Sequence, residues 1–295
     1  MKLIDVINKA TSEGKAVGHF NISNLEAFNA IVKTAKKLNV PVIIGVSEGE
    51  RDFVGVENAV ALVESARKGG AEIFLNADHT YSYVRSVEVI DAGYDAVIID
   101  YASKNKEESI EVTKRVVEYA KSKGPHGALG NPGTPPILVE GELGYIGQSS
   151  KVLDALPEGV LIDPNSLTQP AEAKDFVEKT GVDLLAPAVG NVHGIIKGGN
   201  PALNIERIKE IKQACSVPLV LHGASGITDE ELHLAVLAGI SVVHYNTELR
   251  VAYKDALIKS LEEHKNEVAP YKYLKTAEDA VAEVVEKKLR IMNDL

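Results

Sequence analysis

The chain alternates between short apolar runs and longer amphipathic stretches. The apolar runs lie near Val17, Val42, Ile73, Val97, Val139, Leu184, Val220 and Val243. Segments with helical spacing of apolar positions follow them, for example over residues 24–38, 55–69 and 106–123. Because the runs are continuous rather than alternating, they are typical of strands buried on both faces of a parallel sheet. Eight such pairs predict an α/β protein with a closed TIM (β/α)8 barrel.

The structural alternative is an open, doubly wound sheet. No GxGxxG turn follows the first apolar run, so the usual dinucleotide-binding form of that sheet is disfavoured. No linker or repeat divides the chain, and residues 1–295 are therefore expected to form one barrel domain. The tail over residues 275–292 reads as an additional C-terminal helix that packs against the barrel or a partner subunit.

Two irregular stretches interrupt the alternation, over residues 124–136 and 144–168. The first precedes the fifth strand, on the side of the barrel away from the expected site. The second follows the fifth strand, at the end where barrel enzymes build their sites. Loops of this length are usually functional or disordered, so a mobile lid over the site and plain disorder both fit the second stretch.

Charge and composition narrow the partners. The formal net charge of −10 argues against a nucleic-acid partner, because phosphate backbones attract basic surfaces. It does not exclude a small phosphorylated substrate, since a local pocket can be positive in an acidic protein. No run approaches the ~18 apolar residues of a membrane span. With one cysteine, Cys215, and no signal-like start, the expected location is the cytoplasm.

Polar residues recur at the carboxyl ends of the predicted strands or in the loops that follow. They are His19, Asn21, Ser47, Asp78, His79, Asp100, Glu142, His193, His222 and Asn246. In a barrel these ends converge on one mouth, where active sites are built. Scattered surface polarity would not follow strand ends in this way, so the pattern predicts an active site.

Three of these residues, His79, His193 and His222, come from separate strand ends. Each alone is better explained as a hydrogen-bonded or exposed histidine. Together, three neutral imidazoles with ligand distances of about 2.0–2.1 Å and an open fourth position form a catalytic zinc site. We therefore expect a divalent ion, zinc, at the mouth.

Glycine-rich stretches adjoin two of the histidines. Gly223 and Ser225 follow His222, and Gly194 and Lys197 follow His193. Backbone N–H groups in such loops, a helix start and a lysine can bind phosphate, although most glycine-rich loops are only turns. Beside metal ligands, the phosphate interpretation is favoured. Asp78 could move protons to and from the substrate; the alternatives are a helix N-cap or a residue that orients a ligand.

The motifs GHFNISNLEA, GVSEG, ADH, IID, VEGELG, LAPAVGNVHG, LVLHGASGI and NTELR carry a family resemblance. From about Val17 to Leu274, the chain resembles the class II, zinc-dependent fructose-bisphosphate and tagatose-bisphosphate aldolases. The resemblance implies reversible cleavage of a ketose 1-phosphate or 1,6-bisphosphate to dihydroxyacetone phosphate and an aldehyde, through a zinc-stabilised enediolate. It also implies a homodimer or homotetramer.

The resemblance assigns roles to individual positions. His79, His193 and His222 match the zinc ligands, and Asp78 matches the proton donor. Asp100 and Glu142 match the carboxylates of a second divalent-metal position, and a monovalent cation (Na+ or K+) is expected near the phosphate. The positions that match contacts to dihydroxyacetone phosphate are Gly194, Lys197, Gly223, Ser225, Asn246 and Thr247. Asn21 and Ser47 match positions that reach the rest of the substrate.

Three departures from the family pattern bear on specificity. His244 stands where the family has an asparagine that contacts substrate, and an acidic residue of the loop after Glu142 is replaced within GQSSK. Tyr271 stands where bisphosphate aldolases carry an arginine for the distal phosphate, which removes a charge-assisted contact. These changes suggest an aldehyde other than glyceraldehyde 3-phosphate. They leave open an aldolase for a non-bisphosphorylated sugar, another zinc barrel enzyme such as a hydrolase, or a non-catalytic sugar-phosphate binder.

Overall fold

Eight parallel strands form a closed barrel in the computed structural model, which describes residues 2–123, 136–148 and 150–295. In space the strands follow the order β1-β10-β9-β7-β5-β4-β3-β2. They are β1 (Val17–Asn21), β2 (Val42–Val46), β3 (Ile73–Thr80), β4 (Ala96–Ile99), β5 (Leu138–Leu143), β7 (Leu184–Pro187), β9 (Leu219–Leu221) and β10 (Ile240–Tyr245). The eight predicted strands and the barrel are confirmed.

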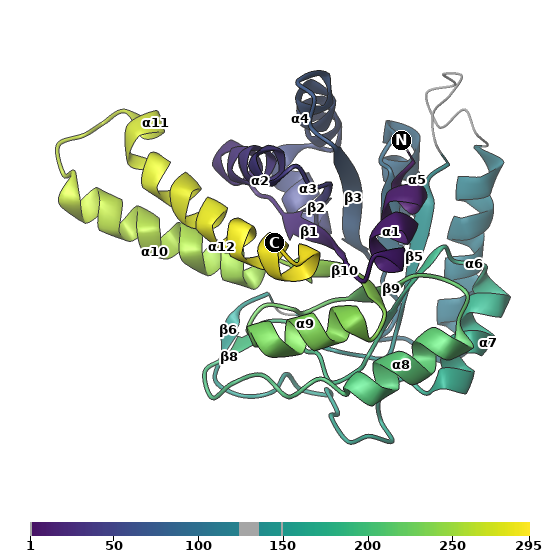
Figure 1. Cartoon of the computed structure of the whole chain (residues 1–295). Coiled ribbons are helices and arrows are strands. Elements are labelled where there is room, and N and C mark those ends of the chain that lie inside the picture. Colours follow the sequence, from purple (N-terminus) through teal and green to yellow (C-terminus); the bar gives the residue numbers. More distant parts are fainter. Residues whose placement is uncertain (1, 124–135, 149) are drawn as a thin grey trace.

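Helices surround the barrel (Figure 1). Those placed by the sequence pattern are α1 (Leu3–Ser12), α2 (Leu25–Leu38), α4 (Val56–Lys68), α5 (Tyr83–Ala92), α6 (Lys106–Ser122), α7 (Pro170–Thr180), α8 (Ile205–Ala214), α9 (Asp229–Leu237), α10 (Thr247–Glu263) and α12 (Lys275–Asn293). Two short helices, α3 (Glu48–Val54) and α11 (Pro270–Tyr273), were not expected. A small parallel sheet of β6 (Val152–Leu153) and β8 (Ile195–Ile196) lies outside the barrel.

The helix ends follow from local sequence. The side chain of Asn24 accepts a hydrogen bond from the backbone N–H of Ala27 and so caps the start of α2. Asn39 ends the same helix in the left-handed conformation. Thr228 and Glu231 form a reciprocal capping box at the start of α9. The Asn24 cap lets α2 begin at Leu25, shortly after β1 ends at Asn21, which keeps that connection at the mouth short.

The barrel interior changes from apolar to polar along each strand. At one end Leu3, Val6 and Ile7 of α1 pack against inward-facing strand residues and close the barrel floor (Figure 1). These strand residues include Val17, Ile43, Phe74, Leu138, Val220 and Val242. Side chains two positions apart on a strand share a face. The inward-facing positions further along each strand, toward its carboxyl end, therefore continue this layer and are polar. The closed floor leaves the carboxyl ends of the strands as the open mouth.

Helices α10 and α12 extend beyond the barrel as an arm, with α11 between them at its far end (Figure 1). Val281, Val285 and Leu289 of α12 are buried, and the helix packs against α2 and α10. The C-terminal helix therefore packs on the barrel, one of the two predicted alternatives. The end of the arm carries exposed apolar residues, including Val268 at 86% and Tyr271 at 76% exposed.

The described residues of the stretch 144–168 include Tyr145, Ser150 and Glu158, which line a cavity at the mouth, and the strand β6, which pairs with β8. The mobility of this stretch stays a prediction. Most of the other irregular stretch, 124–136, lies outside the described residues. In the parts of the chain that the structure describes, no helix has the length and apolar character of a membrane span.

Candidate metal centre and substrate cavity

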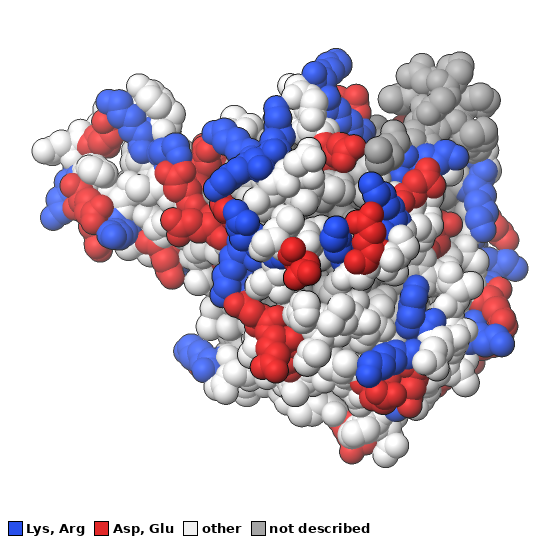
Figure 2. Space-filling view, viewed as in Figure 1, with Lys and Arg blue, Asp and Glu red and all other residues white. Residues whose placement is uncertain are grey.

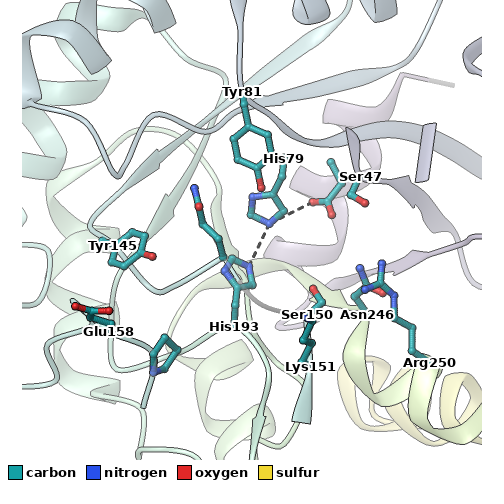
Figure 3. Close-up of a pocket in the computed structure, with 13 residues that line it drawn as sticks. Ser47, His79, Tyr81, Tyr145, Ser150, Lys151, Glu158, His193, Asn246 and Arg250 are labelled. Carbon is teal, nitrogen blue, oxygen red and sulfur yellow. Dashed lines mark hydrogen bonds and ion pairs between the residues drawn. The ribbon is translucent and has the colours of Figure 1, made fainter. Parts of the chain in front are cut away.

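A cavity of about 580 Å³ opens at the carboxyl ends of the barrel strands. Four of the predicted site residues from strand ends or the loops after them line it: Ser47, Asp78, His79 and Asn246. His193 comes to it on the loop between β7 and β8. Figure 3 shows His79 and His193 pointing toward each other, with Tyr145 and Glu158 on one side and Asn246 and Arg250 on the other. These strand-end and loop residues therefore come together at the mouth of the barrel, as their positions along the chain predicted.

Three imidazole nitrogens meet at one point. His79 Nε2 lies 3.1 Å from His193 Nε2 and 3.3 Å from His222 Nδ1. All three ligand atoms lie within 4.8 Å of one another. Two nitrogens bound tetrahedrally to zinc at about 2.0–2.1 Å would lie about 3.3–3.4 Å apart. The spacing of this histidine cluster therefore fits a zinc ion with little movement.

The other nitrogen of each ring is anchored. His79 Nδ1 lies 3.0 Å from Asp100 Oδ2, and His193 Nδ1 lies 2.6 Å from the carbonyl oxygen of Gly147. His222 Nε2 lies 2.6 Å from Glu140 Oε1, and both of these side chains are only 1% exposed. An acceptor at one nitrogen keeps the proton there and leaves the other nitrogen a lone pair for a metal. The anchors therefore prepare all three rings as ligands.

The backbone at the end of β3 turns two consecutive side chains into the mouth. Consecutive residues on a regular strand face opposite sides, yet both Asp78 and His79 line the cavity. His79 has φ +36°, a left-handed value that is rare for a residue with a side chain, and the pairing of β3 with β4 shifts register between Ala77 and Thr80. Such strain persists where surrounding contacts hold it, and it is common at functional sites.

Asp78 is buried and held on one side. Its Oδ2 accepts a hydrogen bond of 2.8 Å from Asn21 Nδ2, which also donates to Glu50 Oε2 at 2.8 Å. Arg51 donates to the backbone oxygen of Asp78. Oδ1 of Asp78 has no hydrogen-bond partner among the described residues, and His244 Nδ1 lies 3.4 Å from it. One oxygen is thus fixed, and the other lies between two imidazoles, 3.4 Å from His244 Nδ1 and 3.8 Å from His79 Nε2.

Two further carboxyl groups lie beside His79. Glu142 Oε2 is 3.6 Å from His79 Nδ1 and has no hydrogen-bond partner in the described part of the chain. Burial, together with the nearby Asp100 charge, raises the pKa of Glu142 to about 8. Burial lowers the pKa of His79, but the charges of Asp78, Asp100 and Glu142 outweigh this effect and raise it to about 10. The carboxyl groups of Asp78, Asp100 and Glu142 around the His79 ring therefore favour a cation at this place.

Two more imidazoles lie below the cluster. The rings of His19 and His244 stack at 3.5 Å, and His244 also stacks on His222 at 4.2 Å. Gly45 makes room, because a Cβ there would lie 2.1 Å from the His19 ring. Burial lowers the pKa of His19 to about 4 and that of His193 to about 3, so neutral rings are favoured at both. The stack packs against His222, and His244 also lines the inner cavity beside the cluster.

An inner cavity adjoins the histidine cluster. Of the residues predicted to hold a phosphate, five line it: Gly194, Gly223, Ser225, Asn246 and Thr247. Gly223 has φ +62°, and a Cβ there would lie 2.3 Å from the carbonyl oxygen of Val192. Glycine is therefore required for the loop after His222 to approach the loop that carries His193.

Lys197 is not brought into this cavity. Its ammonium group is exposed and bonds Asp154 at 2.6 Å, between the loops that carry β6 and β8. Tyr271, at the end of the arm, does not line any of the cavities described here. Neither residue supplies a contact to the site in this conformation.

Sequence reasoning missed Glu140, Glu50 and Arg250. Glu140 lies two positions before Glu142, so strand periodicity places it on the same inward face. Glu50 and Arg250 come from the first turns of α3 and α10, directly after strand ends. Their pairing, with Arg250 Nη2 at 2.5 Å from Glu50 Oε1, joins residues 200 positions apart and has no local signal.

The comparisons with known proteins agree with this geometry. The family model for class-II fructose-bisphosphate aldolase matches residues 1–294. A fructose-bisphosphate aldolase of Staphylococcus epidermidis is 36% identical over 97% of this chain and 94% of its own length. A probable fructose-bisphosphate aldolase of Bacillus subtilis is 34% identical over 98% and 96%.

Solved structures are similar as well. The crystal structure of the YdjI aldolase from Escherichia coli K12 is 28% identical, with a TM-score of 0.78, and the match covers 99% of this chain and 96% of that one. A putative fructose-1,6-bisphosphate aldolase from Coccidioides immitis is 25% identical, with a TM-score of 0.82 and the same coverage.

Proposed function

Because this chain belongs to the class-II fructose-bisphosphate aldolase family, we propose that it reversibly cleaves a ketose 1-phosphate or 1,6-bisphosphate. The products are dihydroxyacetone phosphate and an aldehyde. Membership makes the chain an aldehyde-lyase of a family that generally uses zinc. The observation that carries the proposal is the meeting of three imidazole nitrogens, each on a ring whose other nitrogen is anchored.

In this proposal His79, His193 and His222 hold the zinc ion. Bound there, zinc supplies a Lewis acid that stabilises the negative charge developing on substrate oxygens. Asp100 and Glu142 are candidates for a second divalent position, since they form a further cluster with His79. A monovalent cation, Na+ or K+, remains a candidate near the phosphate.

Asp78 is the residue proposed to move the proton. Its Oδ1 has no hydrogen-bond partner among the described residues, while Asn21 occupies Oδ2. Asp78 lines both the outer and the inner cavity, so its second oxygen is the candidate to donate to or accept from a hydroxyl group of the substrate. Ser47 lines the same cavity and is a candidate contact for the distal half of the substrate.

The inner cavity is proposed to hold the phosphate group. Gly194, Gly223 and Ser225 line it together with Asn246 and Thr247 at the start of α10. The N–H groups at a helix start and in glycine loops favour an anion. Lys197 would have to leave Asp154 to contribute its charge, so its contact with substrate stays a prediction.

We also propose a homodimer or homotetramer in which the arm packs on another copy. Leu261, Val268 and Tyr271 are exposed on the arm, and Phe53 and Val84 are exposed at the barrel rim. Asp52 and Arg85 form an ion pair that holds the two rim segments together.

On the face shown in Figure 2, acidic and basic residues are interspersed rather than gathered into a basic patch, which fits a small-molecule substrate better than nucleic acid.

Metal analysis combined with a coupled assay for dihydroxyacetone phosphate tests the function. We expect about one tightly bound zinc per chain and release of triose phosphate from a ketose phosphate. A hydrolase would release inorganic phosphate without triose phosphate. A non-catalytic binder would take up the sugar phosphate without turnover, and either outcome would refute the proposal.

A further inference from the structure

The short helix α3 carries an arginine whose guanidinium group is completely buried. Arg51 is 1% exposed and lies on α3, which packs against β2 and β3. Its Nη1 donates to the carbonyl oxygen of Val46 at 2.6 Å and to that of Asp78 at 2.9 Å, and its Nη2 donates to Thr80 Oγ1 at 3.0 Å. Two of these three partners are the residues directly before and after His79 in the chain. The guanidinium group therefore brackets a predicted zinc ligand.

The burial of this charge is not explained by a close ion pair. Within the described residues, the carboxyl partner of Arg51 is Glu48, at 3.9 Å, and Nε of Arg51 has no hydrogen-bond partner. Taking a charged group out of water is costly unless hydrogen bonds compensate, and burial accordingly lowers the pKa of Arg51. Most of the compensation comes from acceptors at the ends of β2 and β3. The charge is thus directed at the strand ends that form the mouth.

The bracketed segment is strained. On a regular strand Asp78 and His79 would face opposite sides, and the left-handed φ of +36° at His79 accompanies the turn that brings both to the cavity. A residue with a side chain keeps such a conformation only where surrounding contacts hold it. A second contact from α3 reaches the same segment, because Glu48 Oε2 accepts a hydrogen bond of 3.1 Å from the backbone N–H of Tyr81. The contacts from α3 therefore hold the chain on both sides of position 79.

Helix α3 is itself fixed in place. Glu50 is 5% exposed and forms a capping box with Ser47 at the helix start. Its carboxyl group also accepts hydrogen bonds from Asn21 at 2.8 Å and from Ser23 at 3.2 Å, and it pairs with Arg250. These bonds tie α3 to the end of β1, to the segment after it and to α10. A helix held at several points can support the turn at the end of β3.

We propose that Arg51 is a positioning residue that holds the turn of Asp78 and His79. In this role it sets both the affinity of the three-histidine centre for zinc and the placement of the proton-transfer group. Because it assumes zinc on His79 and proton transfer by Asp78, this role rests on the proposed function. Without the bracket, residue 79 would relax toward extended backbone, and its ring would leave the point where the three imidazoles meet. One substitution in α3 should therefore impair metal binding and catalysis together.

Arg51→Met tests this role, because it removes the donors and keeps a long side chain. We expect the zinc dissociation constant, measured by competition with a chromophoric chelator, to rise about 10–100-fold. The visible spectrum of the cobalt(II)-substituted protein should change, since it reports ligand geometry. At saturating zinc, kcat in the coupled assay should fall about tenfold or more, while KM changes by less than about threefold. Arg51→Lys keeps the charge without the planar fork and should restore part of each property.

Arg67→Met is the matched control. Arg67 lies on α4 and donates to the carbonyl oxygen of Ile73, the first residue of β3, at 2.9 Å. It therefore holds the same strand at the end away from the mouth. Its loss should lower stability in denaturant unfolding but leave the zinc dissociation constant, the cobalt spectrum and kcat at wild-type values.

Thr80→Val is a second, milder variant, because it removes one acceptor of the bracket and nearly keeps the side-chain shape. It should raise the zinc dissociation constant about three- to tenfold and lower kcat in the same direction as Arg51→Met. Should Arg51→Met fail to fold, Thr80→Val decides: wild-type zinc affinity and kcat in this variant would overturn the role of Arg51.

The pattern across the variants separates positioning from simple stabilisation. If Arg51→Met behaves like Arg67→Met, with lower stability but unchanged zinc affinity and cobalt spectrum, Arg51 is not a positioning residue. A wild type that binds zinc without releasing dihydroxyacetone phosphate would refute the aldolase function, and the zinc affinities and cobalt spectra would still decide the role of Arg51. A wild type that binds no zinc would refute both.

Discussion

Replacing Glu140 by glutamine should weaken zinc binding without unfolding the protein. Glu140 Oε1 lies 2.6 Å from His222 Nε2, and this bond keeps the proton on Nε2 so that Nδ1 faces the other two imidazoles. Glutamine has the same shape and can still accept a hydrogen bond, but it removes the negative charge that favours the required tautomer. Substitutions of such supporting residues typically cost about 10–100-fold in metal affinity or activity.

The expected loss of zinc affinity corresponds to about 1.4–2.8 kcal/mol, since each factor of ten is worth about 1.4 kcal/mol. The zinc dissociation constant can be measured by competition with a chromophoric chelator, with metal content determined after dialysis. Glu118→Gln is the control, because Glu118 is 64% exposed and is paired with Lys114 on the surface of α6. A dissociation constant for Glu140→Gln within about twofold of the control would mean that His222 does not bind zinc through Nδ1.

Three other substitutions test separate parts of the site and the proposed assembly. Asp78→Asn should lower kcat by about 10²–10⁴-fold and keep its zinc, because only the proton-transfer group is lost; normal turnover measured in the coupled assay would exclude Asp78 as the proton donor. Gly223→Ala should destabilise the fold by about 1–3 kcal/mol in denaturant unfolding, because φ is +62° and the new Cβ would meet the Val192 carbonyl; unchanged stability would show that the two loops can separate freely. Val268→Asp should shift the mass measured by light scattering toward the monomer, whereas an unchanged oligomer would exclude the arm end as an interface.

The barrel could be predicted because its strands carry strong local patterns. Continuous apolar runs such as those at β2 and β9 are buried on both faces, and the structure has all eight in the expected places. Helices α3 and α11 were missed because each is too short to show a helical period. The ion pair between Arg250 and Glu50 could not be predicted either, since nothing along the chain encodes a contact between residues 200 positions apart.

The residues at the mouth were found because the fold gathers strand ends, whereas their supports lie one step deeper in the barrel. His19, which the strand-end pattern placed at the mouth, precedes a residue assigned from sequence by two positions, as do Glu140 and His244. Two positions further down, these strands carry Val17, Leu138 and Val242 at the floor. The alternation of side chains therefore predicts which residues lie beneath the site.

It does not predict what those deeper residues contact, because that depends on neighbouring strands. The register of β1 against β10 places His19 opposite His244, and the stacking of His244 on His222 depends on the pairing of β10 with β9. A chain with the same three histidines at the metal centre and the same Asp78, but with leucine at positions 19 and 244, would keep the residues assigned to zinc and to proton transfer. It would still lack the imidazole stack beneath His222. The strand ends therefore indicate the reaction class, and the layer below them decides how the ligand rings are supported.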